Sequence, residues 1–217
     1  MLKDLNQSNY GNIQWLEYDR NHIWHPYSRI KRLENNYPVG SASRCSITLA
    51  DGRVLIDGMS SWWAVIHGYN HPRIVKAIKT QASKLCHVMF GGLTHQPAIE
   101  LGKKLIDMTP RNLQQVFFSD SGSVAIEIAM KMAIQFQHSK GDKQRCKFLT
   151  IKGGYHGDTF GAMSVCDPLT GMHTLFSDAI TKQVFSEKPS LAYKSNWDQS
   201  SFETFKKEFN KHREELA

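Results

Sequence analysis

One short turn in this sequence carries residue types that suit the binding of an anion. Residues 120–123 read Asp-Ser-Gly-Ser and follow a β-prone apolar run at 116–119. After the turn, apolar residues recur at helical spacing and mark one buried face, namely Val124, Ile128, Met132 and Phe136. The turn would stand at a helix N-terminus, where free N–H groups and the helix dipole attract anions. Gly122 allows close backbone approach, and Ser123 adds a hydroxyl donor. We predict a phosphate cradle, although an ordinary helix cap uses the same residue types.

A second loop, at residues 152–158, follows another predicted strand at 147–151. It places Tyr155 and His156 directly after two glycines, and an aromatic ring beside a phosphate cradle suits stacking on a planar cofactor ring. The alternative is a surface loop whose tyrosine covers the sheet edge. Asp158 has two interpretations as well, because it could orient such a site or cap the segment that begins at Thr159.

The elements around these loops indicate an α/β fold with a mostly parallel sheet. The spacing predicts a hairpin at 46–57, helices near 72–85 and 97–108, and a C-terminal helix with apolar positions at Phe202, Phe205, Phe209 and Leu216. The first forty residues are expected to be irregular. Ligands of α/β folds bind beyond the carboxyl ends of strands, so the two loops are expected on the same rim.

Composition argues against several functional classes. The formal net charge is +7 over 217 residues, but the basic residues are spread along the chain, so we expect no nucleic-acid partner. No apolar stretch approaches the roughly 20 residues of a membrane span. The four cysteines are scattered, which is typical of reduced thiols in a cytoplasmic protein. His22 and His25 lack a nearby third ligand, so we expect no metal site.

Aromatic residues near the N-terminus have two interpretations. Trp62 and Trp63 stand in tandem before an apolar stretch, and Tyr27 follows a proline. Such residues most often pack in a core or an interface, but they also form pocket walls. The residue types alone leave both interpretations open.

Six motifs together resemble the class III pyridoxal-phosphate aminotransferases. They lie at residues 22–27, 57–64, 67–72, 87–92, 120–123 and 154–159, and the resemblance runs from about Trp24 to Asp167. The Trp-His-Pro-Tyr and Ser-Ser-Trp-Trp motifs are most similar to members that transfer an amino group from S-adenosylmethionine to 8-amino-7-oxononanoate in biotin biosynthesis. The resemblance therefore implies pyridoxal 5'-phosphate as cofactor, these two small molecules as substrates, and a homodimer for the full-length family.

The resemblance also implies site residues and domains. Gly122 and Ser123 would hold the cofactor phosphate, Tyr155 would stack on the pyridine ring, and His156 belongs to the same loop. The substrate pocket would be lined by Tyr27, Trp62 and Tyr155. The fold would be the N-terminal half of a fold-type I transferase. Residues 1–58 would belong to the small domain, with the hairpin, and residues 59–217 would begin the large cofactor-binding domain.

The chain departs from the family in length. Family members are about twice as long, and the resemblance places the lysine that forms the Schiff base, and the aspartate that pairs with the pyridinium nitrogen, beyond Ala217. The contexts of Lys131 and Lys152 recommend neither as a substitute. Two hypotheses stay open: a fragment of an aminotransferase, or a non-catalytic remnant that binds a phosphate ligand or a partner protein. In either case we expect the 217 residues alone to lack transaminase activity.

Overall fold

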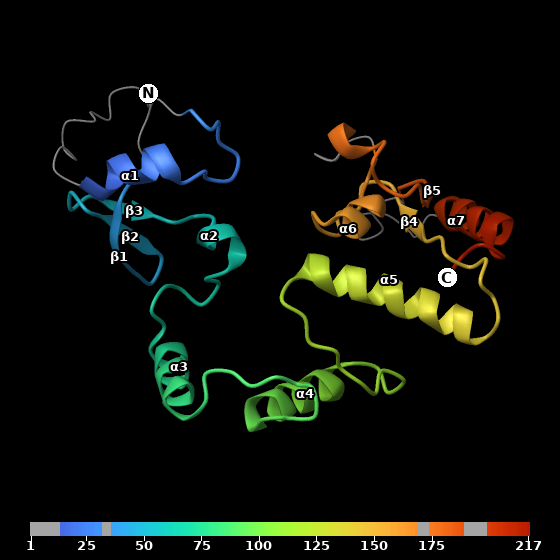
Figure 1. Ribbon diagram of the computed structural model, residues 1–217, viewed down its shortest axis with the longest axis horizontal. Coiled ribbons are helices and arrows are strands. Elements are labelled where there is room, and N and C mark those ends of the chain that lie inside the picture. The colour runs from blue at the N-terminus through green and yellow to red at the C-terminus, as the bar shows by residue number, and fades with distance from the viewer. Residues whose placement is uncertain (1–13, 32–35, 169–173, 189–198) are drawn as a thin grey trace. The chain divides into compact units, whose positions relative to one another are not determined.

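The computed structural model describes residues 14–31, 36–168, 174–188 and 199–217, and the chain forms two compact units, Met1–Ile99 and Glu100–Ala217 (Figure 1). The boundary between the units falls within helix α4, Gln96–Met108. In the described part of the chain, no helix is both long and apolar enough to cross a membrane. The predicted domain division after residue 58 stays a prediction.

The first unit contains an antiparallel sheet of strands β1 (Val39–Ser43), β2 (Ser46–Leu49) and β3 (Val54–Ile56). Strands β2 and β3 form the predicted hairpin, with Ile47 opposite Leu55. The Asp51 carboxylate accepts a hydrogen bond from the N–H of Arg53 at 3.0 Å and fixes the turn. The expectation of forty irregular residues was wrong, because helix α1 (Gln14–His22) lies within them and strand β1 already begins at Val39.

Two helical segments follow the sheet. Helix α3 (Pro72–Lys84) confirms the predicted helix and begins with proline in its first turn, where the missing N–H costs nothing. The short element α2 (Ser60–Trp63) was not expected, and its four residues all have positive φ, from 46° to 67°. A left-handed conformation costs non-glycine residues about 1–2 kcal/mol each, so neighbouring contacts must hold this turn.

The second unit contains helix α5 (Gly122–Ser139), strand β4 (Leu149–Ile151), helix α6 (Phe160–Ser164), strand β5 (Val184–Ser186) and helix α7 (Gln199–His212). Strands β4 and β5 are parallel, with Thr150 opposite Phe185, which confirms the α/β class. Helix α5 packs on α6, and α7 packs on β5. A parallel bridge between Lys147 and Leu216 attaches the residues after α7 beside β4.

Two predictions for the segment around the cradle were wrong. Residues 116–119 form no strand, because none of the described residues offers this segment a ladder partner and the sheet of this unit consists of β4 and β5. The expected buried face of α5 is also only partly covered, since Met132 is 46% and Phe136 is 55% exposed. Helix α5 instead directs Ser123 and Glu127 toward the segment that contains α6.

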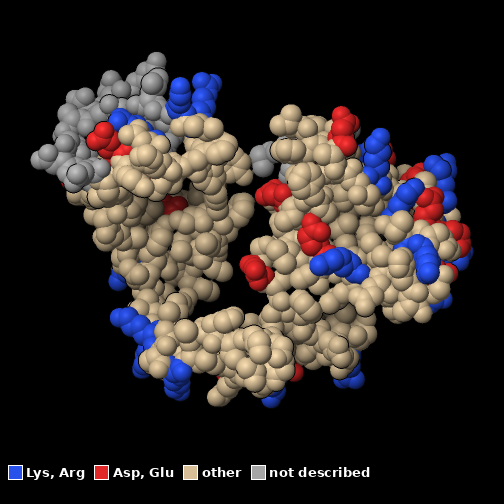
Figure 2. Space-filling model, in the orientation of Figure 1, with Lys and Arg blue, Asp and Glu red and all other residues tan. Residues whose placement is uncertain are grey.

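The buried core is small for the number of apolar residues. Helices α3, α4, α5 and α7 contribute no buried residue, and Phe202 and Phe209 on α7 are nearly half exposed. Figure 2 shows Lys and Arg interspersed with Asp and Glu over α7, where ion pairs such as Lys206–Glu203 join residues one turn apart. Large apolar surfaces therefore remain uncovered in the described residues.

Candidate functional site

The two predicted loops meet in the second unit. The N–H of Asp158 donates to the Ser123 hydroxyl oxygen at 3.0 Å and joins the 152–158 loop to the start of α5. Around this junction lies an open hollow of about 530 Å³, lined by Ser121, Gly122, Ser123, Ala125, Ile126, Tyr155, His156 and Gly157. All four residues predicted to bind the cofactor thus line one hollow, which confirms that the loops converge.

The start of α5 acts both as a cap and as an open set of donors. Ser121 is the N-cap, and its hydroxyl accepts from the N–H of Val124 at 3.2 Å. The next N–H groups, those of Gly122 and Ser123, have no partner inside the helix by geometry. A Cβ atom added at Gly122 would meet no atom within 4 Å, so the side-chain position of this glycine is open. Ser121 therefore provides the ordinary helix cap. The N–H groups of Gly122 and Ser123 are not used by this cap and are available for an anion.

The Tyr155 ring is exposed, but its hydroxyl is held. Tyr155 is 65% exposed, and its Oη donates to Oδ2 of Asp158 at 2.8 Å. The same Asp158 contributes its N–H to Ser123, so one residue fixes both the ring and the cradle. This geometry favours the interpretation that Asp158 orients the site.

The 152–158 loop is also held by the residues that follow α6. The N–H of His156 donates to the buried Cys166 Sγ at 3.2 Å, and the N–H of Gly153 donates to Oδ2 of Asp167 at 2.9 Å. Lys152 pairs with Glu187 at the strand end. The loop therefore presents Tyr155 and His156 from a backbone with several fixed points.

Glu127 supports the site and was missed in the sequence. Its Oε1 accepts from the N–H of Gly161 at 2.7 Å, which attaches α5 to the beginning of α6. The neighbouring Thr159 hydroxyl holds the pKa of the Glu127 carboxyl below its ordinary value, the N–H of Gly161 adds to this effect, and partial burial opposes it. The sequence spacing could have indicated this residue, because Glu127 stands four residues after Ser123 and therefore lies on the same helix face.

A pH-dependent contribution of Glu127 to stability follows from this lowered pKa. The contribution is fully present above the unfolded value of about 4.5 and is lost as the pH falls through the lower folded pKa. We expect Glu127→Gln to reduce the free energy of unfolding by about 1–2 kcal/mol near neutral pH, and the difference from wild type to shrink below pH about 4. Denaturant unfolding of the complete protein at several pH values measures this, with the exposed Glu203→Gln on α7 as control. A difference that grows toward acidic pH would contradict the assignment.

Two of the three residues predicted to line the substrate pocket, Tyr27 and Trp62, contact each other in the first unit, whereas the third, Tyr155, belongs to the second unit. The rings of Tyr27 and Trp62 are 5.5 Å apart between centroids and meet edge to face at 86°. Tyr27 is 76% and Trp62 is 60% exposed, so this aromatic pair is not part of a core. This exposure argues against packing in the core of the unit and leaves interface packing and a pocket wall as the two interpretations.

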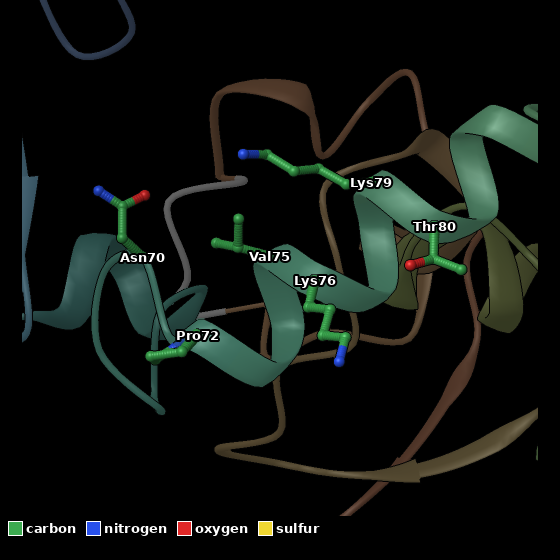
Figure 3. Close-up of a pocket in the computed structure, with 6 residues that line it drawn as sticks. All are labelled: Asn70, Pro72, Val75, Lys76, Lys79 and Thr80. Atoms are coloured by element: carbon green, nitrogen blue, oxygen red, sulfur yellow. The ribbon is translucent and has the colours of Figure 1, made fainter.

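A second hollow, of about 590 Å³, lies at the start of α3 (Figure 3). Its lining includes Asn70, Val75, Lys76 and Lys79. Figure 3 shows that the side chains of Lys76 and Lys79 extend in different directions, so their charges do not converge. This hollow is slightly larger than the one at Ser123, but it lacks an aromatic ring and a set of donors aimed at one point.

The chain is similar to aminotransferases. Residues 30–217 match the family described as Aminotransferase class-III. The adenosylmethionine-8-amino-7-oxononanoate aminotransferase of Buchnera aphidicola subsp. Acyrthosiphon pisum is 50% identical over 200 residues, which cover 92% of this chain and 46% of that protein. The crystal structure of the same-named enzyme from Methanocaldococcus jannaschii superposes with a TM-score of 0.81 at 36% identity, over 93% of this chain and 45% of that one.

A third similar protein is an omega transaminase from Pseudomonas jessenii, solved in complex with PMP, with a TM-score of 0.75 at 26% identity over 93% of this chain and 47% of that one. The chain thus spans less than half the length of each of these three proteins.

Proposed function

This chain belongs to the class-III aminotransferase family, and from that premise we propose that it takes part in amino transfer from S-adenosylmethionine to 8-amino-7-oxononanoate, a step of biotin biosynthesis. The observation that supports the proposal within the structure is the junction of Ser123 with Asp158, which assembles an anion cradle beside an exposed aromatic ring. Fold similarity alone would leave the reaction open, because many chemistries share one fold.

The residues present fit pyridoxal 5'-phosphate. The N–H groups of Gly122 and Ser123 would donate to its phosphate, and the open side-chain position of Gly122 leaves room for the phosphate oxygens. The Ser123 hydroxyl accepts from Asp158 and still has its own proton to donate. Tyr155, held through its hydroxyl, would lie against the pyridine ring, and His156 would close the same side of the hollow. When bound, this cofactor supplies an electron sink for the transfer of an amino group.

Tyr27 and Trp62 would bind the substrates. Their edge-to-face contact makes a rigid aromatic corner with an apolar surface and one phenolic hydroxyl. Such a corner suits the alkyl chain of 8-amino-7-oxononanoate and the sulfonium cation of S-adenosylmethionine, because aromatic faces attract cations. Tyr155 is assigned to both groups of residues on the family resemblance.

The experiment uses the complete protein that the gene containing these residues encodes. We expect cofactor absorbance after incubation with pyridoxal 5'-phosphate, and turnover of 8-amino-7-oxononanoate that requires S-adenosylmethionine. Ser123→Glu should abolish cofactor binding, because a carboxylate would repel the phosphate, whereas Ser139→Glu at the other end of α5 should leave it intact. Cofactor binding without any turnover would support the alternative of a non-catalytic remnant. No binding by wild type would contradict the proposed function and a remnant that binds a phosphate ligand, and would favour a remnant that binds a partner protein.

A further inference from the structure

The backbone around Trp62 is strained in an unusual way. Ser60, Ser61, Trp62 and Trp63 have φ values of 48°, 46°, 54° and 67°, a left-handed conformation in four successive residues that all carry side chains. Left-handed residues normally occur singly and are mostly glycine. Strain of this kind persists only where surrounding contacts enforce it, and it concentrates at functional sites. The question is therefore which contacts enforce it here.

Most of the polar contacts converge on Asp57. Its Oδ2 accepts from the N–H of Ser61 at 2.8 Å, from the Ser61 hydroxyl at 3.2 Å and from the Tyr69 hydroxyl at 2.6 Å. Its Oδ1 accepts from the N–H of Met59 at 3.1 Å. The Ser61 and Tyr69 hydroxyls also contact each other, and because each has one proton, the Ser61 hydroxyl donates either to Asp57 or to Tyr69 while Tyr69 donates to Asp57. One carboxylate thus fixes the backbone at Met59, just before the left-handed turn, and at Ser61, the second residue of the turn.

Asp57 and Tyr69 are themselves attached to the β-sheet. The N–H of Asp57 donates to the carbonyl of Cys45 at 2.9 Å, beside the start of β2. Arg44 lies in the turn between β1 and β2. Its N–H donates to the carbonyl of Tyr69 at 3.1 Å, and the N–H of Tyr69 donates to the carbonyl of Arg44 at 2.7 Å. The hydrogen bond from Tyr69 holds the pKa of the Asp57 carboxyl below its ordinary value, against a weaker opposing effect of burial, so this group is a carboxylate at neutral pH.

The turn determines where Trp62 points. Trp62 is the third of the four left-handed residues, and its ring meets Tyr27 edge to face at 5.5 Å. The groups that donate to the Asp57 carboxylate belong to Met59, Ser61 and Tyr69 and not to Trp62, so the carboxylate acts on Trp62 through the backbone of Ser61. If the turn relaxed to a right-handed conformation, the Cα–Cβ bond of Trp62 would change direction and the contact with Tyr27 would be lost.

We propose that Asp57 is a positioning residue whose carboxylate, together with Tyr69, holds the left-handed turn at residues 60–63 and so sets the aromatic corner of Tyr27 and Trp62 for substrate. The inference rests on the proposed function, because it assigns substrate binding to this corner. It involves none of the residues that line the cofactor hollow. The cofactor and the substrate should therefore respond differently when Asp57 is changed.

The test is Asp57→Ala in the complete protein, with Asp51→Ala as the matched control. Asp51 likewise accepts a backbone N–H in a turn of the same unit, but it holds the hairpin rather than residues 60–63. We expect Asp57→Ala to raise KM for 8-amino-7-oxononanoate on the order of 10-fold or more, since small misplacements of positioning groups have effects of this size. Cofactor absorbance and its affinity should stay at the wild-type value. Asp51→Ala should leave KM within about 2-fold of wild type.

Two further variants keep the inference testable if Asp57→Ala does not fold. Tyr69→Phe removes only one hydroxyl and should raise KM in the same direction by a smaller factor. Adding Ser60→Gly to Asp57→Ala should recover part of the loss, because glycine adopts a positive φ without strain. An unchanged KM in Asp57→Ala, or a KM rise with an equal loss of cofactor affinity, would overturn the inference. Absence of turnover in wild type would instead overturn the proposed function.

Discussion

Gly157→Ala is expected to reduce the affinity of the protein for pyridoxal 5'-phosphate by about 100-fold or more. Gly157 has a φ of +126°, and a Cβ atom placed on it would lie 2.2 Å from Ser123 Oγ and 2.7 Å from Ser123 Cα. A backbone atom cannot give way as a flexible side chain can, so the 152–158 loop and the start of α5 would have to separate. The hydrogen bond from Asp158 to Ser123 would then be lost.

The size of this effect follows from what the junction positions. Hydrogen bonds to a charged group contribute about 1.5–3 kcal/mol each, and the donors of Gly122 and Ser123 would no longer face the phosphate together. Loss of two such bonds amounts to about 3 kcal/mol or more, and each 1.4 kcal/mol is about tenfold in affinity. Stacking by Tyr155 would weaken as well, because its hydroxyl partner Asp158 moves with the loop.

Cofactor titration followed by absorbance measures the affinity, and Gly141→Ala is the matched control. Gly141 also has a positive φ, of +91°, but an added Cβ there meets nothing within 4 Å. This control carries the backbone strain without the collision. Wild-type cofactor affinity in Gly157→Ala, or an equal loss in both variants, would show that the junction with Ser123 does not determine the site.

Residues 1–217 produced by themselves are expected to lack a cooperative thermal transition. The long helices α3, α4, α5 and α7 have no buried residue, and the fully buried apolar side chains are few. Folding must offset a conformational entropy of about 1–2 kcal/mol per residue, mainly by burying apolar surface. With Phe117 at 65% and Trp63 at 74% exposure, much of that surface stays in water.

Circular dichroism during heating and size-exclusion chromatography measure this behaviour. We expect a broad, non-cooperative loss of helix signal and a tendency to associate through the uncovered apolar faces. Co-expression with the residues of a curated relative that this chain does not cover should sharpen the transition, since those residues would cover the exposed helix faces. A sharp transition and a monodisperse peak for residues 1–217 alone would contradict the expectation and favour a self-sufficient binding module.

Short-range patterns in the sequence were sufficient for several elements. The Asp51-Gly52 turn between two β-prone runs predicted the hairpin, and Pro72 predicted the start of α3, because both depend on backbone preferences within a few residues. The Ser-Gly-Ser turn predicted a helix start that could receive an anion. The motifs also indicated the class-III family, and the family match over residues 30–217 confirmed it.

Only the tertiary structure decided the features that depend on distant partners. Residues 116–119 have strand-forming side chains but no ladder neighbour among the described residues, and a strand needs one. The close approach of Gly157 to Ser123, and the hydrogen bond from Tyr69 to Asp57, are contacts that no local preference encodes. Local propensity for residues 60–63 even opposes the observed conformation. The sequence by itself therefore determined the family and the candidate site residues, and long-range hydrogen bonds decided how those residues are held.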